Sequence, residues 1–373
     1  MNLKKITALI LSFCLIIGSA GTLMASPAEN TMPTLTVEEA ARRAISNHSG
    51  IANAQGDESV ADEVVRRAQD AVWEASTSMA LTTAMVSLMN AELSRSLNIR
   101  DIAAQRENVE FQITRYFNTI LNMQDDIAML ENNLEMAKRD LVIAELKLSL
   151  GMMSQLDYDG AELSVIRTET NIELMNSSLA GAFRDLNSFM GVYGIELDQR
   201  YELLLEMPEY TVLPQVNLNH HAQMFVRESL RVQQAENAAE AARYRVEYYV
   251  TPHNPLTGEI VPGLTLDEEI NNQNRALRAL SDTRQAVRES IITMHANLRT
   301  QELQIRASEI EIERLQRQLE VLETMLELGR TTAIEVDALR LNIASQENSL
   351  AQAKNNHTIL AFAFNNPNII MGS

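Results

Sequence analysis

Cysteine is nearly absent from this sequence. The one cysteine in 373 residues is Cys14, which lies inside an apolar N-terminal run. A chain that loses this run therefore has no disulfide, no thiolate metal site and no cysteine nucleophile. The bulky Phe13 before Cys14, and the position of Cys14 inside the run, also argue against a lipid-modified cysteine.

Proline and aromatic residues are scarce as well. No proline occurs between Thr34 and Met207, and Phe, Trp and Tyr together make up 5% of the chain. Helix interiors exclude proline and strands favour aromatic residues, so this composition predicts long helices and little sheet. We expect an all-α protein with helices over 36–54, 58–97, 99–150, 154–190, 217–250, 267–328 and 332–364.

Basic residues are outnumbered by acidic ones. The sequence has 31 Lys and Arg against 50 Asp and Glu, which gives a formal net charge of −19. This balance excludes nucleic acid as a partner held by bulk charge. Cations, cationic solutes or a basic protein are better suited to so acidic a chain.

The motifs of catalysis and metal binding are also missing. The six histidines form no HExxH or His-x-His pattern, and there is no phosphate-binding glycine loop and no Gly-x-Ser-x-Gly element. We therefore expect no enzyme, no catalytic residue, no metal site and no cofactor. His220 and His221 are expected to cap a helix or face solvent, and the acid pairs at 125–126 and 268–269 to lie on solvated helix faces.

The N-terminus has the pattern of a secretory signal peptide. Lys4 and Lys5 precede a short apolar run over 6–17, and small residues follow up to Ala25. The run is too short for a stable membrane span. We expect residues 1–25 to be a signal peptide that exports the rest of the chain to the cell envelope.

Two segments carry an apolar heptad with alternating spacings of three and four residues. This spacing places the side chains along one seam and is typical of long helices that pack as coiled coils. The first seam comprises Ile127, Leu130, Leu134, Ala137, Leu141, Ala144 and Leu148; the second comprises Ile305, Ser308, Ile312, Leu315, Leu319, Leu322 and Leu326.

The two seams differ by a constant 178 positions, and the glycines that follow them, Gly151 and Gly329, differ by the same number. Upstream, segments that begin at Leu35 and Val216 match at an offset of 181. A constant offset over so long a stretch indicates a tandem duplication of the chain.

This duplication sets the expected domain organisation. After the signal peptide we expect a first helical repeat over 35–191 and a second over 216–364, followed by a C-terminal tail over 365–373. The repeats are joined by a linker over 192–215, where Pro208 and Pro214 break the helical pattern.

Each repeat predicts a hairpin of two long helices with its tip at a glycine, Gly151 or Gly329. Glycine readily adopts the left-handed conformation in which helices commonly end. Ser154 and Thr332 are suited to cap the returning helices, whose first turns each hold an acid. A plain coiled-coil hairpin with no further function explains this pattern by itself.

Three segments, in this order, resemble the TolC-type outer-membrane efflux protein family: LTVEEAARRAISNHSG from Leu35, VEFQITRYFNTIL from Val109, and LELGRTTAIEVDALRLNIASQENSLAQA from Leu326. The tandem repeat is itself a hallmark of that family. The resemblance implies a homotrimer whose hairpins form a tapered α-helical barrel that is sealed at the hairpin tips. It also implies that a pump and its periplasmic adaptor dock at the tips and that solutes leave through the tube.

The resemblance further implies rings of acidic side chains just after the tip glycine. Glu335 matches the first ring position, whereas the second is occupied by Ala338, with Asp337 one residue away. Asp157 and Asp159 are the counterparts in the first repeat. Three copies of a carboxylate in a narrow pore would favour cations. The alternative is that these residues are ordinary acids in the first turns of solvated helices.

The sequence departs from the family where transmembrane β-strands should lie. Residues 71–93 do not alternate as a membrane strand does, and residues 250–266 contain prolines and at most one short hairpin. We expect the transmembrane strands to be reduced or absent. Residues 75–91 carry no charge, so they either touch a membrane or pack between subunits.

The most concrete function is that of a TolC-like envelope component of an efflux or export system, which forms a trimeric helical conduit or docking module. An adaptor-like or pump protein would dock near 145–160 and 322–340. We also expect association with a membrane, in the periplasm or outer membrane, or on the extracytoplasmic surface of a cell without an outer membrane. The alternative is a non-conducting structural coiled-coil protein of the envelope.

Overall fold

The computed structural model describes residues 32–251 and 263–369. The expected signal peptide, most of the segment 250–266 and the last four residues of the tail lie outside these ranges. Among the residues described, no helix has both the length and the apolar character needed to cross a membrane.

Helices dominate the described chain, which confirms the all-α expectation. The first half contains β1 (Thr34–Thr36), α1 (Val37–Asn47), α2 (Ser49–Glu74), α3 (Ser78–Ser149) and α4 (Gln155–Phe189). The linker contains a 3-10 helix, η1 (Gly194–Asp198), and β2 (Glu202–Leu204). The second half contains α5 (Leu218–Glu228), α6 (Leu230–Glu247), α7 (Leu266–Glu327) and α8 (Ala333–Asn365).

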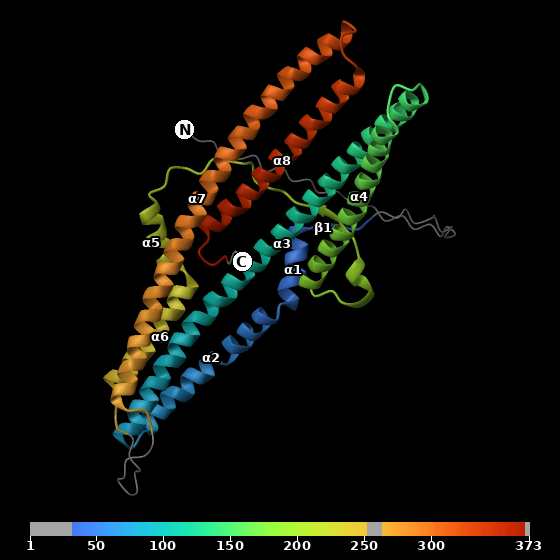
Figure 1. Cartoon of the computed structure of the whole chain (residues 1–373). Helices are drawn as coiled ribbons and strands as arrows, with labels where there is room; N and C mark the ends of the chain where they lie inside the picture. Colours follow the sequence, from blue (N-terminus) through green and yellow to red (C-terminus); the bar gives the residue numbers. More distant parts are fainter. Residues whose placement is uncertain (1–31, 252–262, 370–373) are drawn as a thin grey trace, which may run out of the picture.

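The molecule is elongated and is built around α3 and α7, which run along most of its length (Figure 1). With 72 residues, α3 is about 108 Å long at ~1.5 Å per residue. Helices α4 and α8 return from the tips, which lie at one end of the molecule, whereas the α2–α3 turn, the end of α6 and the start of α7 lie at the other. At the level of the hairpins the lateral order is α7, α8, α3, α4, and α8 packs against α3.

Capping residues decide where the two longest helices begin. Thr77 caps α3 by accepting a hydrogen bond from the amide of Ala80, and Thr265 forms a capping box with Glu268 at the start of α7. The helix expected over 58–97 therefore ends at Glu74, and the boundary expected near residue 98 does not exist. Helix α3 runs unbroken through residue 98, whereas the break at 75–77 is determined by the hydroxyl cap of Thr77.

Two expected helices are divided by a short bend. The helix expected over 36–54 breaks at His48, whose Nδ1 accepts a hydrogen bond from the amide of Ile51 at 3.2 Å. The helix expected over 217–250 breaks at Ser229, which is buried and has extended backbone angles. Each bend lets a short first helix tilt across the long helices and pack against them.

The two short strands join the start of the chain to the linker. They are paired in parallel, with Leu35 opposite Leu203. Both leucines are buried in the first core. The linker is therefore held against the first half, although three-residue strands give too little alternation to be predicted from sequence.

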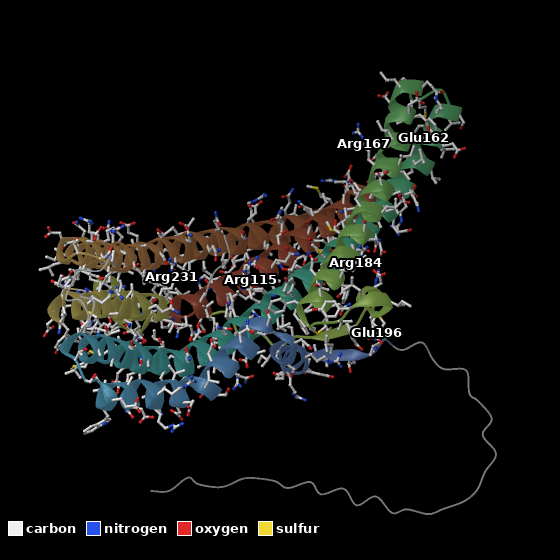
Figure 2. All side chains as sticks on the ribbon, turned by 90° about the horizontal axis from the view of Figure 1, so that it is seen from below. Arg115, Glu162, Arg167, Arg184, Glu196 and Arg231 are labelled. Carbon is white, nitrogen blue, oxygen red and sulfur yellow. The ribbon has the colours of Figure 1, made fainter. Side chains whose placement is uncertain are left out.

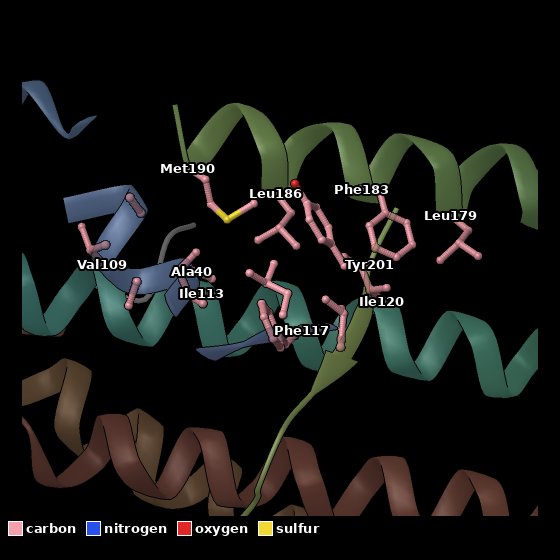
Figure 3. Packing of buried hydrophobic residues seen from close by; sticks show 14 of the residues in the cluster. Ala40, Val109, Ile113, Phe117, Ile120, Leu179, Phe183, Leu186, Met190 and Tyr201 are labelled. Atoms are coloured by element: carbon pink, nitrogen blue, oxygen red, sulfur yellow. The ribbon is translucent and has the colours of Figure 1, made fainter. Parts of the chain in front are cut away.

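Each half has its own hydrophobic core. In the first, Ile113 and Phe117 of α3 pack under Phe183 and Leu186 of α4, next to α1 and Tyr201 (Figure 3). The second core is centred on residues of α5, α7 and α8, which include Phe225, Ile291, Leu298 and Phe364. These cores lie at the bases of the hairpins and hold the long arms in position.

Candidate functional site at the hairpin tips

Both hairpins turn with the same backbone geometry. Gly151 and Gly329 have φ angles of 68° and 69°. The amide of Met152 donates to the carbonyl of Lys147 at 2.8 Å, and the amide of Arg330 makes the equivalent bond to Met325 at 2.8 Å. The amide of each glycine bonds three residues back at 2.9 Å, which completes a Schellman motif at both tips. The last carbonyls of α3 and α7 are thereby satisfied.

The returning helices begin at hydroxyl caps. The hydroxyl of Ser154 accepts a hydrogen bond from the amide of Asp157 at 3.2 Å and donates to its carboxylate at 2.7 Å. Thr332 accepts from the amide of Glu335 at 3.4 Å, and the hydroxyl of Thr331 donates to the Glu335 carboxylate. Asp157 and Glu335 thus occupy the same position of the two tips, where the helix dipole favours a negative charge.

The other two candidate acids differ from each other. Asp159 accepts a hydrogen bond from Gln155 at 2.7 Å and is exposed. Asp337 lies between two guanidinium groups, 3.6 Å from Arg139 of α3 and 3.5 Å from Arg340. Because Arg139 belongs to the other hairpin, Asp337 helps to hold the two hairpins together, and its charge is largely compensated.

A groove of about 650 Å³ separates the α3–α4 hairpin from α8. Its walls carry small and polar side chains, among them Ala137 and Asp140 of α3, Ser164 of α4, and Ala338 of α8. The second ring position, Ala338, therefore faces the space between the hairpins. Figure 2 shows the outer part of the α3–α4 hairpin, marked by Glu162 and Arg167, standing apart from α7 and α8.

Below this groove the hairpins are linked through Asp126. Its Oδ1 accepts hydrogen bonds from Asn348 at 3.2 Å and from Gln352 at 2.8 Å, both on α8. The expectation of a solvated acid pair is therefore wrong for Asp126, although Asp125 is exposed. Partial desolvation by the neighbouring helices, followed by repulsion from Asp126, raises the pKa of Asp125.

The two outermost helices each carry an exposed apolar face that points away from the partner helix of their own hairpin. The seam positions of α7 are buried or half-buried, and Val165, Leu179 and Phe183 are buried on α4. At about 100° per residue, the exposed positions lie on the opposite side of each helix. The outer face of α4 comprises Leu156, Leu163, Ile166 and Leu174. The outer face of α7 comprises Leu303, Ile310 and Val321, and Leu328 continues it at the C-cap. Sequence reasoning found the seams but missed these faces, although both contain spacings of seven and eleven residues.

A buried polar cluster fixes the linker to the second hairpin. The Glu302 carboxylate accepts hydrogen bonds from the amide of Leu213 and from Arg299, both at 2.7 Å. His357 on α8 is fully buried, with Nε2 3.4 Å from Glu302, and its ring meets Tyr210 edge-on at 5.0 Å. Burial lowers the pKa of His357, while the amide and the guanidinium overcome the burial of Glu302 and lower the pKa of that carboxyl.

Two further expectations about polar residues are wrong. His221 neither caps α5 nor faces solvent: Asn217 is the cap, and His221 stacks on Phe364 at 4.3 Å. Glu269 is buried, 3.5 Å from Arg245, rather than solvated. Each of these side chains points to the inner side of its helix. Two adjacent polar residues in a sequence do not show which of them is buried. Within the described ranges, no cluster of three or more His, Cys, Asp or Glu could hold a metal ion.

The fold matches those of solved membrane proteins, among them outer membrane proteins. VceC from Vibrio cholerae matches with a TM-score of 0.60 and 11% identity, over 88% of this chain and 96% of that one. A membrane protein from Pseudomonas aeruginosa matches with 0.63 and 11%, over 94% and 96%. The outer membrane channel CmeC from Campylobacter jejuni matches with 0.57 and 12%, over 96% and 95%. No family model and no curated protein matches the sequence. The fold implied by the resemblance is thus confirmed.

Proposed function

We propose that this chain is a TolC-like envelope component of an efflux or export system, and that three copies form a helical conduit or docking module. The observation that carries the proposal is the lateral order α7, α8, α3, α4, with both tips at one end and an exposed apolar face on each outermost helix. The fold shared with solved outer membrane channels supports it.

The two outer faces differ from each other, so copies of the chain would associate head to tail. The α4 face of one copy would pack against the α7 face of the next, as α3 packs against α8 within the chain. A head-to-tail contact closes into a ring when the rotation fits. A tandem duplication would give each copy two similar hairpins, so that similar hairpins repeat around the ring. The resemblance to the TolC-type family implies three copies.

The acids at the tips would line the narrow end of such a ring. Asp157 and Glu335 stand at equivalent positions, and neither is paired with a basic side chain within 4.0 Å in the described structure. Three copies of each would make that end selective for cations. Asp337 is a weaker candidate because Arg139 and Arg340 compensate its charge.

The exposed side chains at the tips suggest the chemistry of the docking partner. The first tip exposes Leu150 and Met152, and the second exposes Ile334. An adaptor-like or pump protein with an apolar hairpin end and basic flanks would fit these apolar side chains and the adjacent acids. The cell envelope is the location that this role requires.

The alternative is a non-conducting coiled-coil scaffold of the envelope. It is favoured by the observation that all four candidate acids are hydrogen-bonded or ion-paired to neighbouring side chains. An acid that caps a helix or joins two hairpins needs no pore to explain its presence. The two functions differ in whether the assembly conducts.

The first test is the molar mass of residues 26–373 by light scattering after gel filtration, with and without mild detergent. Removal of 1–25 leaves every described element intact, since β1 begins at Thr34. Three times the protomer mass is the expected result, and one protomer mass under both conditions would overturn the conduit.

Conductance then separates the two functions. Reconstituted trimers should conduct with a preference for cations that Glu335→Gln reduces. Glu196→Gln, an exposed acid at the base of the hairpin, should leave that preference unchanged. A trimer that does not conduct would support the scaffold.

A further inference from the structure

A pocket of about 320 Å³ lies between the two halves of the chain. Its walls are formed by α3, the bend between α5 and α6, α7 and the segment 367–369. Figure 2 marks Arg231, at the start of α6, well away from Glu162 and Arg167 of the first hairpin. A pocket of this volume is large enough for a small molecule. It belongs neither to the hairpin tips nor to the outer faces of α4 and α7.

The α6 wall of this pocket offers hydrogen-bond donors that have no acceptor. Ser229 is 3% exposed, and its hydroxyl makes no hydrogen bond within the described residues, although serine at this position commonly caps a helix. The amide of Leu230 donates to Oδ1 of Asn368 at 3.1 Å, whereas the amide of Arg231 meets no acceptor in the described ranges. A buried hydroxyl without a partner costs free energy. Ser229 therefore indicates a bound group that accepts its hydrogen bond.

The α3 wall offers hydrogen-bond acceptors. The carboxylate of Asp101 accepts a hydrogen bond from Nε2 of Gln105 at 2.6 Å through one oxygen. Asn108 also lines the pocket, and its Oδ1 is buried without a hydrogen-bond partner. A carboxylate has room for several donors. This wall is therefore suited to a cationic group that donates hydrogen bonds.

The charges on the two walls have opposite signs. Asp101 and Arg231 line the same pocket, and neither forms an ion pair within 4.0 Å in the part of the chain that the structure describes. A carboxylate is favoured at the start of α6, where free amides and the helix dipole attract an anion. An ammonium group is favoured beside the Asp101 carboxylate. The remaining lining includes the apolar side chains Phe225, Val287 and Met294.

We propose that this pocket binds a small zwitterion with an apolar side chain, of the class of a free α-amino acid such as leucine. The carboxylate of the ligand accepts hydrogen bonds from the Ser229 hydroxyl and the Arg231 amide. Its ammonium group donates to Asp101 and Asn108, and its side chain lies against the apolar lining, which includes Phe225. A single chain forms the whole site, so the inference goes beyond the proposed conduit and does not depend on a trimer.

The test is isothermal titration calorimetry of residues 26–373 with L-leucine and two analogues of similar shape. Isocaproate keeps the carboxylate and lacks the ammonium group, whereas isoamylamine keeps the ammonium group and lacks the carboxylate. Leucine should bind, and each analogue should bind at least about tenfold more weakly, because it loses charge-assisted hydrogen bonds to one wall.

Substitutions on each wall assign the two ends of the ligand. Asp101→Asn should weaken leucine binding by about tenfold and should not weaken isocaproate binding, since the ammonium group alone loses its partner. Ser229→Ala should weaken the binding of both by about threefold to tenfold. Its thermal unfolding should match that of the parent chain, because the hydroxyl bonds to nothing within the described residues.

Two exposed neighbours on α7 provide the matched controls. Ser281 and Asp282 do not line the pocket. Ser281→Ala and Asp282→Asn should therefore bind leucine as the parent chain does.

Three results would overturn the proposal: no binding of leucine up to about 10 mM, equal affinity for leucine and isocaproate, or an equal loss of affinity in Asp101→Asn and Asp282→Asn. The mass measurement tests the trimer separately. A monomer that binds leucine would refute the conduit and leave this inference standing, whereas a trimer that does not bind leucine would refute this inference alone.

Discussion

At the residue scale, the turn of each hairpin depends on a glycine that another residue cannot replace without strain. Gly151 and Gly329 have left-handed φ angles, whereas Gly160 is inside α4, where a Cβ would meet no atom within 4 Å. Space is available at all three positions, so only the backbone conformation distinguishes them. A side chain at Gly151 or Gly329 would therefore strain the backbone through its left-handed φ angle and would not clash with a neighbouring residue.

Gly329→Ala should lower the free energy of unfolding by about 1–2 kcal/mol, the cost of a left-handed residue with a Cβ. Gly160→Ala should raise it by about 0.5–1 kcal/mol, because alanine loses less backbone entropy in a helix. Urea denaturation followed by circular dichroism measures both. Equal effects of the two substitutions would contradict the role given to the tip glycine.

The buried His357 makes stability depend on pH. Burial lowers its pKa in the folded chain, so the unfolded imidazole, with a pKa of about 6.5, takes up a proton first. Stability should therefore fall as the pH falls through about 6.5. The lowered pKa of Glu302 acts in the same direction, but only near the ordinary carboxyl range of about 4–5.

His357→Gln should reduce the loss of stability between pH 7.5 and pH 5.5 in about the range where free imidazole titrates. His220→Gln, at an exposed position, should keep the parent slope. Urea midpoints at a series of pH values give the comparison. Parallel pH profiles for the parent and His357→Gln would show that this histidine is not the responsible group.

At the scale of elements, α3 and α8 are joined by an apolar cluster around Phe111 and by a few polar contacts nearer the tips. Asp126 accepts two hydrogen bonds from α8, and Asp337 is paired with Arg139. Exposed ion pairs contribute about 0–1 kcal/mol, whereas a half-buried amide that loses a charged acceptor costs more. The Asp126 contact is thus the stronger of these two polar links.

Asp126→Ala should lower the free energy of unfolding by about 1–3 kcal/mol, because Asn348 and Gln352 lose a shared charged acceptor. Asp125→Ala is the neighbouring control and should change stability little, since Asp125 is exposed and is repelled by Asp126. Thermal unfolding of both variants and of the parent chain measures the two changes in stability. A larger loss for Asp125→Ala would contradict the assignment of the link.

The sequence was sufficient to predict the elements that repeat over many residues. The heptad seams in α3 and α7 are long enough for their period to be unambiguous. The glycine and the Ser or Thr residues at the tips favour turn and cap conformations by themselves. The breaks at His48 and at 75–77 were not predicted, because one cap decides each of them. Asp126, His221 and Glu269 were misjudged because their partners are far away in sequence.

At the scale of the whole molecule, α7, α8, α3 and α4 lie side by side, and the two outermost helices carry different apolar edges. Leu163 and Val321 represent these edges, on α4 and α7, and neither edge is covered within the chain. A closed ring needs head-to-tail contacts between two different surfaces of the chain. The α4 and α7 edges differ in sequence and have similar spacings, so each can pack against the other. The central claim is therefore that α4 of one copy lies beside α7 of the next.

Cross-linking tests this claim most directly, because residues 26–373 contain no cysteine. In Leu163→Cys/Val321→Cys, a bismaleimide spacer should join α4 of one copy to α7 of the next and give a product of three chains that grows no further. Each single variant, and the control pair Leu163→Cys/Ile195→Cys, should remain a single chain on a denaturing gel. Single chains from the double variant, or linked chains from either single variant, would contradict the ring of hairpins.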